Sequence, residues 1–244
     1  MLIVNRKFVL MNKLDILVFA AHPDDVELAC SGTVLKHISL GYKVGIVDLT
    51  KGELGTRGSA EIRAEESKKS SEILGIHARE NLGFRDGFFE IDEAHLLKVV
   101  SIIRKYQPEI ILANASSDRH PDHKRAGDLI SRANFLSGLM KIEDEQPAWR
   151  AKTIYRYIQD NYVKPDVIVD ISRFELQKLE AIKAFKSQFY DANSTEPQTP
   201  ISKPDFLDFI LARAKEFGRS INAEYGEGFT VERNIGVNNL FDLV

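Results

Sequence analysis

Apolar and polar residues alternate in blocks along the chain, with short apolar runs separated by longer segments in which apolar residues recur at helical spacing. The short runs predict strands at Leu14 to Ala20, Lys43 to Leu49, Ala78 to Leu82, Glu109 to Ala113, Thr153 to Gln159 and Val167 to Asp170. The longer segments predict helices at Val26 to Leu40, Ala60 to Leu74, Glu93 to Tyr106, Pro121 to Phe135, Phe174 to Phe189 and Pro204 to Arg219. Strands this apolar are covered on both faces, so the alternation predicts an α/β fold: a doubly wound, mostly parallel, Rossmann-like sheet with helices on both faces.

In a doubly wound sheet of strand order 3-2-1-4-5, the first and fourth strands are neighbours, and ligands bind in the crevice at their carboxyl ends. Functional side chains are therefore expected directly after these two strands. No Gly-x-Gly-x-x-Gly motif follows the first strand, so the sequence does not support an ordinary dinucleotide site.

Two clusters of histidine and aspartate occupy these two positions. His22-Pro23-Asp24-Asp25 follows the first strand, and His120-Pro121-Asp122-His123 follows the fourth through a short polar loop. Asp25 lies three residues after His22, so one turn of chain can offer a nitrogen and an oxygen to a divalent cation such as zinc. Asp24, pointing differently, is free to handle a proton, and a nearby helix N-terminus predicts that both aspartates are ionised at neutral pH. Either cluster alone is equally well explained as a helix-capping turn, but the pair favours a metal site.

The loop from Thr50 to Ser59 contains three glycines and Arg57, and it follows the second strand. Arg119 precedes the second cluster. A guanidinium presents a planar fork of donors that suits a carboxylate or a sugar hydroxyl, so both arginines are candidates for substrate binding. An ordinary solvated loop charge is the alternative for Arg57.

Composition excludes several classes of protein. The formal net charge is −3 and no basic stripe is present, so we expect no nucleic-acid partner. The single cysteine, Cys30, excludes an intramolecular disulfide and a cysteine-rich zinc motif. No apolar run reaches the length of a membrane span and no signal peptide is evident, so we expect a cytoplasmic protein without a membrane partner. Met11 is as good a start as Met1, and we divide the chain into an N-terminal extension (1–12) and one domain (13–244).

On these residues the chain resembles the LmbE-like, or PIG-L, family of zinc-dependent N-acetylglucosamine deacetylases. Its marks are a His-Pro-Asp-Asp motif after the first strand and a later His-Pro-Asp-His motif, and both are intact here. The deacetylase branch of bacillithiol biosynthesis is more similar still. The stretches that carry this similarity are Gly52 to Gly58, Asp118 to His123, Lys186 to Tyr190, Glu224 to Phe229 and Asn239 to Leu243.

The resemblance implies removal of the acetyl group from N-acetylglucosaminyl malate by zinc-activated water. It implies His22, Asp25 and His123 as zinc ligands and Asp24 as the general base. A protonated His120, with Asp122 orienting its ring, would stabilise the oxyanion. It also implies a homo-oligomer, because members of this family often form homo-oligomers and some of them form hexamers.

Two alternatives remain open at this point. The first is a deacetylase or amidase acting on another N-acetylated sugar or sugar-thiol conjugate. The second is a metal- or nucleotide-binding module without catalysis, which this fold permits. Asp24 argues against the second, because a structural zinc site has no use for an unliganded carboxylate. A site of this composition also accepts Fe²⁺, cobalt or manganese in place of Zn²⁺.

Overall fold

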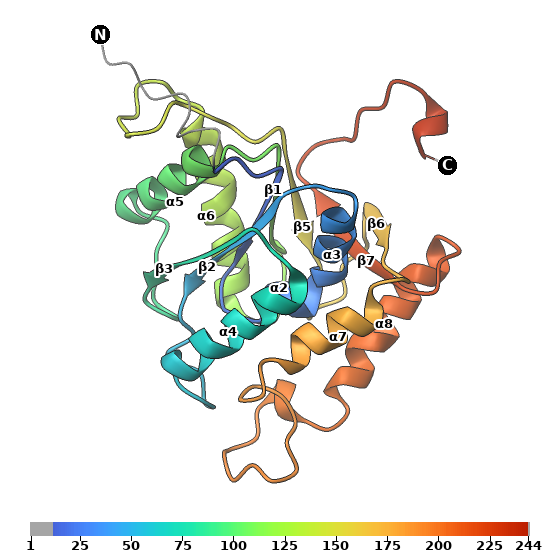
Figure 1. Cartoon of the computed structure of the whole chain (residues 1–244). Helices are drawn as coiled ribbons and strands as arrows, with labels where there is room; N and C mark the ends of the chain where they lie inside the picture. The colour runs from blue at the N-terminus through green and yellow to red at the C-terminus, as the bar shows by residue number, and fades with distance from the viewer. Residues whose placement is uncertain (1–11, 244) are drawn as a thin grey trace.

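The computed structural model describes residues 12–243, and a sheet of seven strands in the order β3-β2-β1-β4-β5-β7-β6 runs through its centre (Figure 1). The strands are β1 (Ile16–Ala20), β2 (Val44–Thr50), β3 (Ala78–Phe84), β4 (Ile110–Asn114), β5 (Thr153–Tyr157), β6 (Val167–Asp170) and β7 (Gly226–Val231). The order 3-2-1-4-5 is confirmed, with β1 parallel to both β2 and β4. The predicted extension falls almost wholly on residues 1–11, which lie outside the described part of the chain, and it stays a prediction.

Helices cover both faces of the sheet, as expected (Figure 1). They are α2 (Asp25–Ala29), α3 (Ser31–Ser39), α4 (Ala60–Leu74), α5 (Glu93–Tyr106), α6 (Pro121–Ser137), α7 (Glu175–Lys183) and α8 (Phe206–Ser220), with short 3-10 turns η1 (Pro200–Ser202) and η2 (Leu240–Leu243). Successive residues of β1 serve opposite cores: Leu17 and Phe19 pack with α5 and α6, whereas Ile16 and Val18 pack on the α3 side. Within residues 12–243, none of these helices is long and apolar enough to cross a membrane.

The helix predicted from Val26 to Leu40 is in fact two helices that meet at Cys30. A buried carboxylate from the far end of the chain explains the break. Glu227 accepts hydrogen bonds from the N–H groups of Gly32 (2.9 Å) and Thr33 (2.6 Å), and its Oε1 also pairs with Lys178 Nζ (2.6 Å). A second helix N-terminus at Ser31 makes these donors available to the carboxylate. Only the tertiary structure brings Glu227 to this place.

The sequence analysis missed β7, which inserts antiparallel between β5 and β6. Its glycines have the composition of a loop, but they fit a crowded strand: a Cβ on Gly226 would lie 2.7 Å from Ile168 Cγ2. The similar stretches 186–190 and 224–229 contribute to the interior of the molecule, because Gln188, Phe189 and Glu227 are buried. A reading of these stretches as solvated surface is therefore wrong for these three residues.

Candidate metal centre and active site

The two histidine and aspartate clusters meet at the carboxyl edge of the sheet, because β1 and β4, which precede them, are paired in parallel. Neighbouring strand ends fix the turn after β1. Asn114 accepts a hydrogen bond from the Ala21 N–H (3.0 Å), and Thr50 Oγ1 donates to the Ala21 carbonyl (2.9 Å). In this turn Asp24 has a φ of 112°, a left-handed conformation that costs a non-glycine residue about 1–2 kcal/mol. Three strand ends therefore set the direction of the Asp24 side chain.

His22 and His123 each have one ring nitrogen beside Asp25 and the other beside a second carboxylate. His123 Nε2 lies 3.1 Å from Asp25 Oδ1, and His123 Nδ1 lies 2.8 Å from Asp118 Oδ2. His22 Nδ1 lies 3.7 Å from Asp25 Oδ2, and His22 Nε2 lies 3.1 Å from Asp86 Oδ1. Histidines that bind metals commonly hold a carboxylate with the nitrogen that does not face the metal. The structure gives both histidines this arrangement.

Sequence reasoning missed both of these supporting carboxylates. Asp118 stands two residues before the second cluster, and that position was the available signal for it. Asp86 lies in the loop after β3, just before Phe88 and Phe89, and no spacing in the sequence relates it to either cluster. Its other carboxylate oxygen accepts a hydrogen bond from the Leu54 N–H (3.0 Å), so Asp86 also ties the glycine loop to the site.

Asp25 is buried and held by several donors. Its Oδ1 accepts a hydrogen bond from Gln159 Nε2 (2.8 Å), and its Oδ2 accepts from Asn114 Nδ2 (3.1 Å) and from the His22 N–H (3.0 Å). Burial by itself would raise the pKa of Asp25, but the charge and hydrogen bond of His123 hold that pKa well below its usual range. Asp25 is therefore a fixed anion between the two histidines.

Two overlapping groups of side chains could hold a metal ion, and both contain His22. Ligand atoms lie within 4.8 Å of one another in the group His22, His120 and His123 and in the group His22, Asp86 and Asp122. The predicted set shares His22 and His123 with the first group and only His22 with the second; its third member, Asp25, lies beside His22 and His123 at the distances given above. Imidazole nitrogens and carboxylate oxygens are ligands that zinc and related divalent metals accept, so the donor chemistry fits a metal. The choice of His22, Asp25 and His123 as ligands stays a prediction.

The protonation of the cluster follows from burial and neighbouring charge. Burial acts to lower the pKa of both histidines, but hydrogen bonds to Asp122, Asp25 and Asp86 raise the pKa of His22 well above its usual value. In the same way Asp25 and Asp118 raise the pKa of His123 to about 9. These histidines carry protons where a metal would bind.

Asp24 differs from the expectation that both aspartates are ionised at neutral pH. Burial raises the pKa of Asp24 to about 7, although the nearby Arg63 guanidinium acts to lower it. The helix N-terminus that was expected to keep it ionised belongs to a helix of five residues, and burial outweighs it. Within residues 12–243, no group donates a hydrogen bond to the Asp24 carboxylate. This carboxylate lines a cavity that opens over the cluster.

His120 lies at the start of α6, in ring contact with both other histidines of the cluster. Its Nδ1 accepts a hydrogen bond from the Asp122 N–H (3.3 Å), so a proton of the neutral ring sits on Nε2. Burial and the charges of His22 and His123 lower its pKa, which favours the neutral form over the protonated form that was expected. The carboxylate of Asp122 contacts Arg125 (2.8 Å) and the Gly87 N–H (2.8 Å), so Asp122 reaches His120 through its backbone.

A cavity of about 320 Å³ opens over these groups. It is lined by His22, Asp24, Asp25, Leu54, Thr56, Arg63, Asp86, Arg119, His120, His123, Gln159, Gln188 and the η1 turn, among others. Arg119 lines it and pairs with Asp160. Arg57 is not among the lining residues: its Nη2 donates to Ser194 Oγ (2.8 Å) and its Nε to Glu196 (3.4 Å). Arg57 therefore contacts the loop that leads to η1.

Arg63, from α4, was not predicted, and Gln188, from the segment after α7, was named only within the similar stretch Lys186 to Tyr190, without a role in the site. Arg63 donates to the Pro23 carbonyl (3.3 Å) and to Gln188 Oε1, while its Nε is buried without a partner. Gln188 Nε2 donates in turn to the Arg57 carbonyl (3.0 Å). Two segments far apart in sequence thus form one wall of the cavity.

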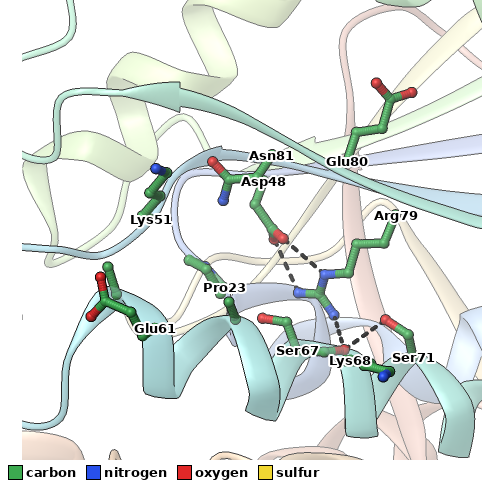
Figure 2. A pocket seen from close by; sticks show the side chains of 12 residues that line it. Pro23, Asp48, Lys51, Glu61, Ser67, Lys68, Ser71, Arg79, Glu80 and Asn81 are labelled. Carbon is green, nitrogen blue, oxygen red and sulfur yellow. Dashed lines mark hydrogen bonds and ion pairs between the residues drawn. The ribbon is translucent and has the colours of Figure 1, made fainter.

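A larger cavity, of about 490 Å³, is lined by residues of α4, β2 and β3 and by Pro23 (Figure 2). Its dominant feature is Arg79, which donates two hydrogen bonds to Asp48 (2.8 and 3.0 Å) and one to Glu27 (2.7 Å). This buried ion pair links β2, β3 and α2, the helix that begins at Asp25. The cavity contains no histidine and none of the predicted site residues, so we place the chemistry in the smaller cavity.

Comparison with known proteins agrees with this site. Residues 17–134 match the family described as PIG-L: GlcNAc-PI de-N-acetylase. A diacetylchitobiose deacetylase from Thermococcus kodakarensis is 32% identical over 190 residues, which span 71% of this chain and 70% of that protein. A probable N-acetyl-alpha-D-glucosaminyl L-malate deacetylase 2 from Bacillus cereus is 30% identical over 186 residues, 71% of this chain and 83% of that protein. The crystal structure of the conserved protein TT1542 from Thermus thermophilus is 34% identical, with a TM-score of 0.84 over 92% of this chain and 98% of that one.

The fold, the histidine and aspartate cluster and these relatives define a hydrolytic N-deacetylase. The chain belongs to the PIG-L, or LmbE-like, deacetylase family, which confirms the resemblance drawn from its two motifs.

Proposed function

We propose that this protein removes the acetyl group from N-acetylglucosaminyl malate, in the cytoplasm, as a step of bacillithiol biosynthesis. One observation carries the proposal: side chains that could hold a metal ion line the same cavity as the Asp24 carboxylate, which accepts no hydrogen bond from residues 12–243. The malate conjugate is supported by the name of the Bacillus relative and by the similar stretches noted above. A deacetylase of another N-acetylated sugar conjugate is the alternative.

The metal in this proposal is Zn²⁺, with Fe²⁺ as the alternative, held by His22, Asp25 and His123. When bound, such an ion supplies a Lewis acid for the acetamide carbonyl and lowers the pKa of water beside it to about 7. Asp118 contacts Nδ1 of His123 (2.8 Å) and Asp86 contacts Nε2 of His22 (3.1 Å). These contacts fix the orientation of the two rings.

Asp24 acts as the general base in this proposal. Its carboxylate takes the proton of the attacking water and then delivers it to the leaving amine, so one group serves both halves of the reaction. A base is most effective when its pKa lies near the working pH, and the pKa of about 7 meets that condition. A cation beside Asp24 and the Arg63 guanidinium both favour the ionised form that accepts the proton.

His120 stabilises the negative charge that develops on the carbonyl oxygen of the substrate. Because the Asp122 N–H occupies Nδ1 (3.3 Å), the Nε2–H is available to donate to that oxygen. The neutral ring is sufficient for this role. Loss of one such contact typically costs about 3 kcal/mol in the barrier, or on the order of a hundredfold in rate.

Charged groups on the cavity wall are proposed to bind the parts of the substrate other than the acetamide. Arg119 is the candidate for the malate carboxylates, because its side chain is half exposed at the cavity and its only ion pair among residues 12–243 is with Asp160. Among residues 12–243, the buried Nε–H of Arg63 has no hydrogen-bond partner, which suits a sugar hydroxyl. Arg57 acts on the substrate through the loop containing Ser194 and Glu196, which leads to η1 at the cavity.

The test is acetate release by the zinc-loaded protein from N-acetylglucosaminyl malate and, in parallel, from free N-acetylglucosamine at matched concentration. We expect a strong preference for the conjugate, reduced in an Arg119→Gln variant mainly through KM. Equal turnover of the two compounds would remove malate from the proposal and leave the deacetylase. No turnover of either would count against the substrate class.

A further inference from the structure

The larger cavity, of about 490 Å³, has no part in the deacetylation proposed above, although its volume suits a small organic ligand. One face of α4 forms a wall of this cavity with small side chains at helical spacing: Ala60, Ala64, Ser67 and Ser71. Residues of β2 and β3 and Pro23 complete the lining (Figure 2). Ala64 is exposed within it, so the cavity is open to solvent.

Two hydrogen-bond donors that line the cavity have no partner among residues 12–243. Ser67 is 7% exposed, and its Oγ is buried without a hydrogen bond. Arg79 uses Nε and one N–H of Nη2 for Asp48 (2.8 and 3.0 Å), and it uses Nη1 for Glu27 (2.7 Å) and the Ser67 carbonyl (3.5 Å). The second N–H of Nη2 is left over. Buried donors are normally bonded, so a ligand is the partner that these two lack.

The charges around the cavity leave an excess of unpaired cation. Lys51 and Lys68 line it, and neither ammonium group forms an ion pair or a hydrogen bond among residues 12–243. Two acidic residues of the lining, Asp48 and Glu80, already have cationic partners. The third, Glu61, lies near Lys51 but forms no ion pair with it. The free groups are therefore two ammonium groups against one carboxylate.

This set of free groups selects the chemistry of the ligand. Ammonium, guanidinium and hydroxyl groups all donate hydrogen bonds, and the oxygens of a phosphate or a carboxylate accept from all three. Donors to a charged acceptor form the stronger hydrogen bonds, so an oxyanion is preferred over a neutral group. The volume of the cavity leaves room for a body of about the size of a monosaccharide beside the oxyanion.

The cavity adjoins the active site through a turn and a helix. Pro23 lines it, between His22 and Asp24, and the Pro23 carbonyl accepts a hydrogen bond from Arg63 Nη1 (3.3 Å). Arg63 lines the catalytic cavity, whereas the next residue of α4, Ala64, lines the larger one. Asp24 has a φ of 112°, a conformation that depends on support from its surroundings. A ligand here would contact both the turn that carries Asp24 and the helix that carries Arg63.

We propose that this cavity is an effector site for a small organic anion, of monosaccharide size with a phosphate or carboxylate group, whose binding changes the rate of deacetylation. Lys51, Lys68 and Ser67 bind the oxyanion, and the body of the effector packs on Pro23 and Ala64. The effector acts because it contacts the two elements that position the catalytic groups. This inference does not depend on which N-acetyl sugar the enzyme deacetylates.

The first test is titration calorimetry of the zinc-loaded protein with glucose 6-phosphate, glucuronate and glucose. The three compounds share a sugar ring and differ in the group on its last carbon. We expect one or both anions to bind at least about tenfold more tightly than glucose. Binding of only one anion identifies the effector as a phosphate or as a carboxylate. Equal binding of all three compounds, or binding of none, would overturn the proposal.

The second test locates the bound anion with variants. Lys51→Met/Lys68→Met should weaken its binding by at least about tenfold, and Ser67→Ala by about tenfold. Ser67→Ala should leave the midpoint of urea unfolding unchanged, because its Oγ has no partner to lose. Lys141→Met/Lys164→Met, at exposed lysines that do not line the cavity, is the matched control and should bind like the natural chain. Unchanged binding in Lys51→Met/Lys68→Met would show that the anion binds elsewhere.

The third test measures deacetylation at rising concentrations of the anion that binds. We expect kcat to change by at least about fivefold in the natural chain and to stay constant in Lys51→Met/Lys68→Met, whose rate without the anion is that of the natural chain. Free N-acetylglucosamine replaces the malate conjugate if the conjugate is not hydrolysed, so failure of the proposed substrate is seen separately. A constant kcat at saturating anion, or an effect that more substrate removes, would contradict an effector site.

Discussion

Asp24 and Asp25 are neighbours in sequence but have opposite electrostatic environments. Asp25 accepts three hydrogen bonds and lies 3.1 Å from His123, so its charged form is strongly favoured. Asp24 accepts none from residues 12–243, and burial raises its pKa to about 7. A difference of this kind between two carboxylates commonly separates a ligand from an acid or base.

This difference predicts different results for the two amide variants. In Asp24→Asn the metal is retained, but turnover falls by on the order of 10²–10⁴-fold because the base is lost. In Asp25→Asn metal affinity falls as well, because the fixed anion between His22 and His123 is removed. Metal content after dialysis and kcat are the measurements. Equal metal retention in both variants would refute the division of roles.

The histidine pKa values predict that metal binding releases protons. The pKa of His123 is raised to about 9 and that of His22 is raised also, so both are protonated at pH 7 and must lose a proton before they bind a cation. Metal affinity should therefore rise with pH through neutrality, by about tenfold per pH unit for each proton displaced, and the contribution of His123 should level off above about pH 9.

Titration calorimetry of zinc in two buffers of different ionisation enthalpy measures this release. The matched control is His37→Ala, a half-buried histidine of α3 outside the cluster, which leaves the cluster intact and should release the same number of protons. His123→Ala should release fewer. A zinc affinity that does not change between about pH 6 and pH 9 would show that metal binding displaces no protons from the two histidines.

At the scale of elements, the position of α6 depends on close contact with β4. Gly127 faces the end of that strand: a Cβ there would lie 2.6 Å from the Asn114 carbonyl oxygen and would overlap the Arg156 guanidinium. The backbone of Asn114 cannot move freely, because its side chain holds the Ala21 N–H and Asp25. Helix α6 carries His120 and His123, so this contact sets the second half of the site.

Gly127→Ala should therefore affect both stability and metal binding. Overpacking of this kind costs about 1–3 kcal/mol in the free energy of unfolding, and displacement of α6 moves His123 away from Asp25. Urea unfolding and zinc titration are the measurements. Arg132→Ala, an exposed position on the same helix, is the matched control and should change neither. Unchanged zinc affinity in a destabilised Gly127→Ala protein would show that the contact between Gly127 and Asn114 does not set the position of His123.

At the scale of the whole molecule, the active site is assembled from distant parts of the chain. The cavity takes residues from the turn after β1, from α4, from the loops after β3 and β4, and from the segment that follows α7. Buried ion pairs between distant elements, such as Arg79 with Glu27 and Asp48, hold these parts together. Binding of a metal by ligands from two of these parts is therefore coupled to the folding of the whole.

This coupling predicts that zinc stabilises the folded chain. A ligand that binds only the native state at a hundred times its Kd adds about 2.7 kcal/mol to the free energy of unfolding. The melting temperature should rise with added zinc and fall after treatment with a chelator. His123→Ala should lose the response, whereas Arg132→Ala, the exposed control on α6, should keep it. A chelator-insensitive melting temperature would contradict a metal held by both clusters.

The sequence by itself determined the order of the first five strands in the sheet, the position of the two clusters after β1 and β4, and the family. The reason is that apolar periodicity and short motifs are local, and the rule that parallel strands share a carboxyl edge converts them into neighbours in space. The contacts that orient the site were not local. Asp86, Arg63 and Gln188 act on it through packing, and no spacing relates them to the clusters, whereas Asp118 stands two residues before the second cluster.

The tertiary structure alone decided where charged and apolar side chains are buried. Glu227 divides the first predicted helix at Cys30 because β7 inserts beside β5, and burial gives Asp24 a pKa of about 7 in place of an ordinary ionised carboxyl. Both effects depend on desolvation by segments that are distant in sequence. The motif supplied the chemical groups, and the packing around them set their charge and direction.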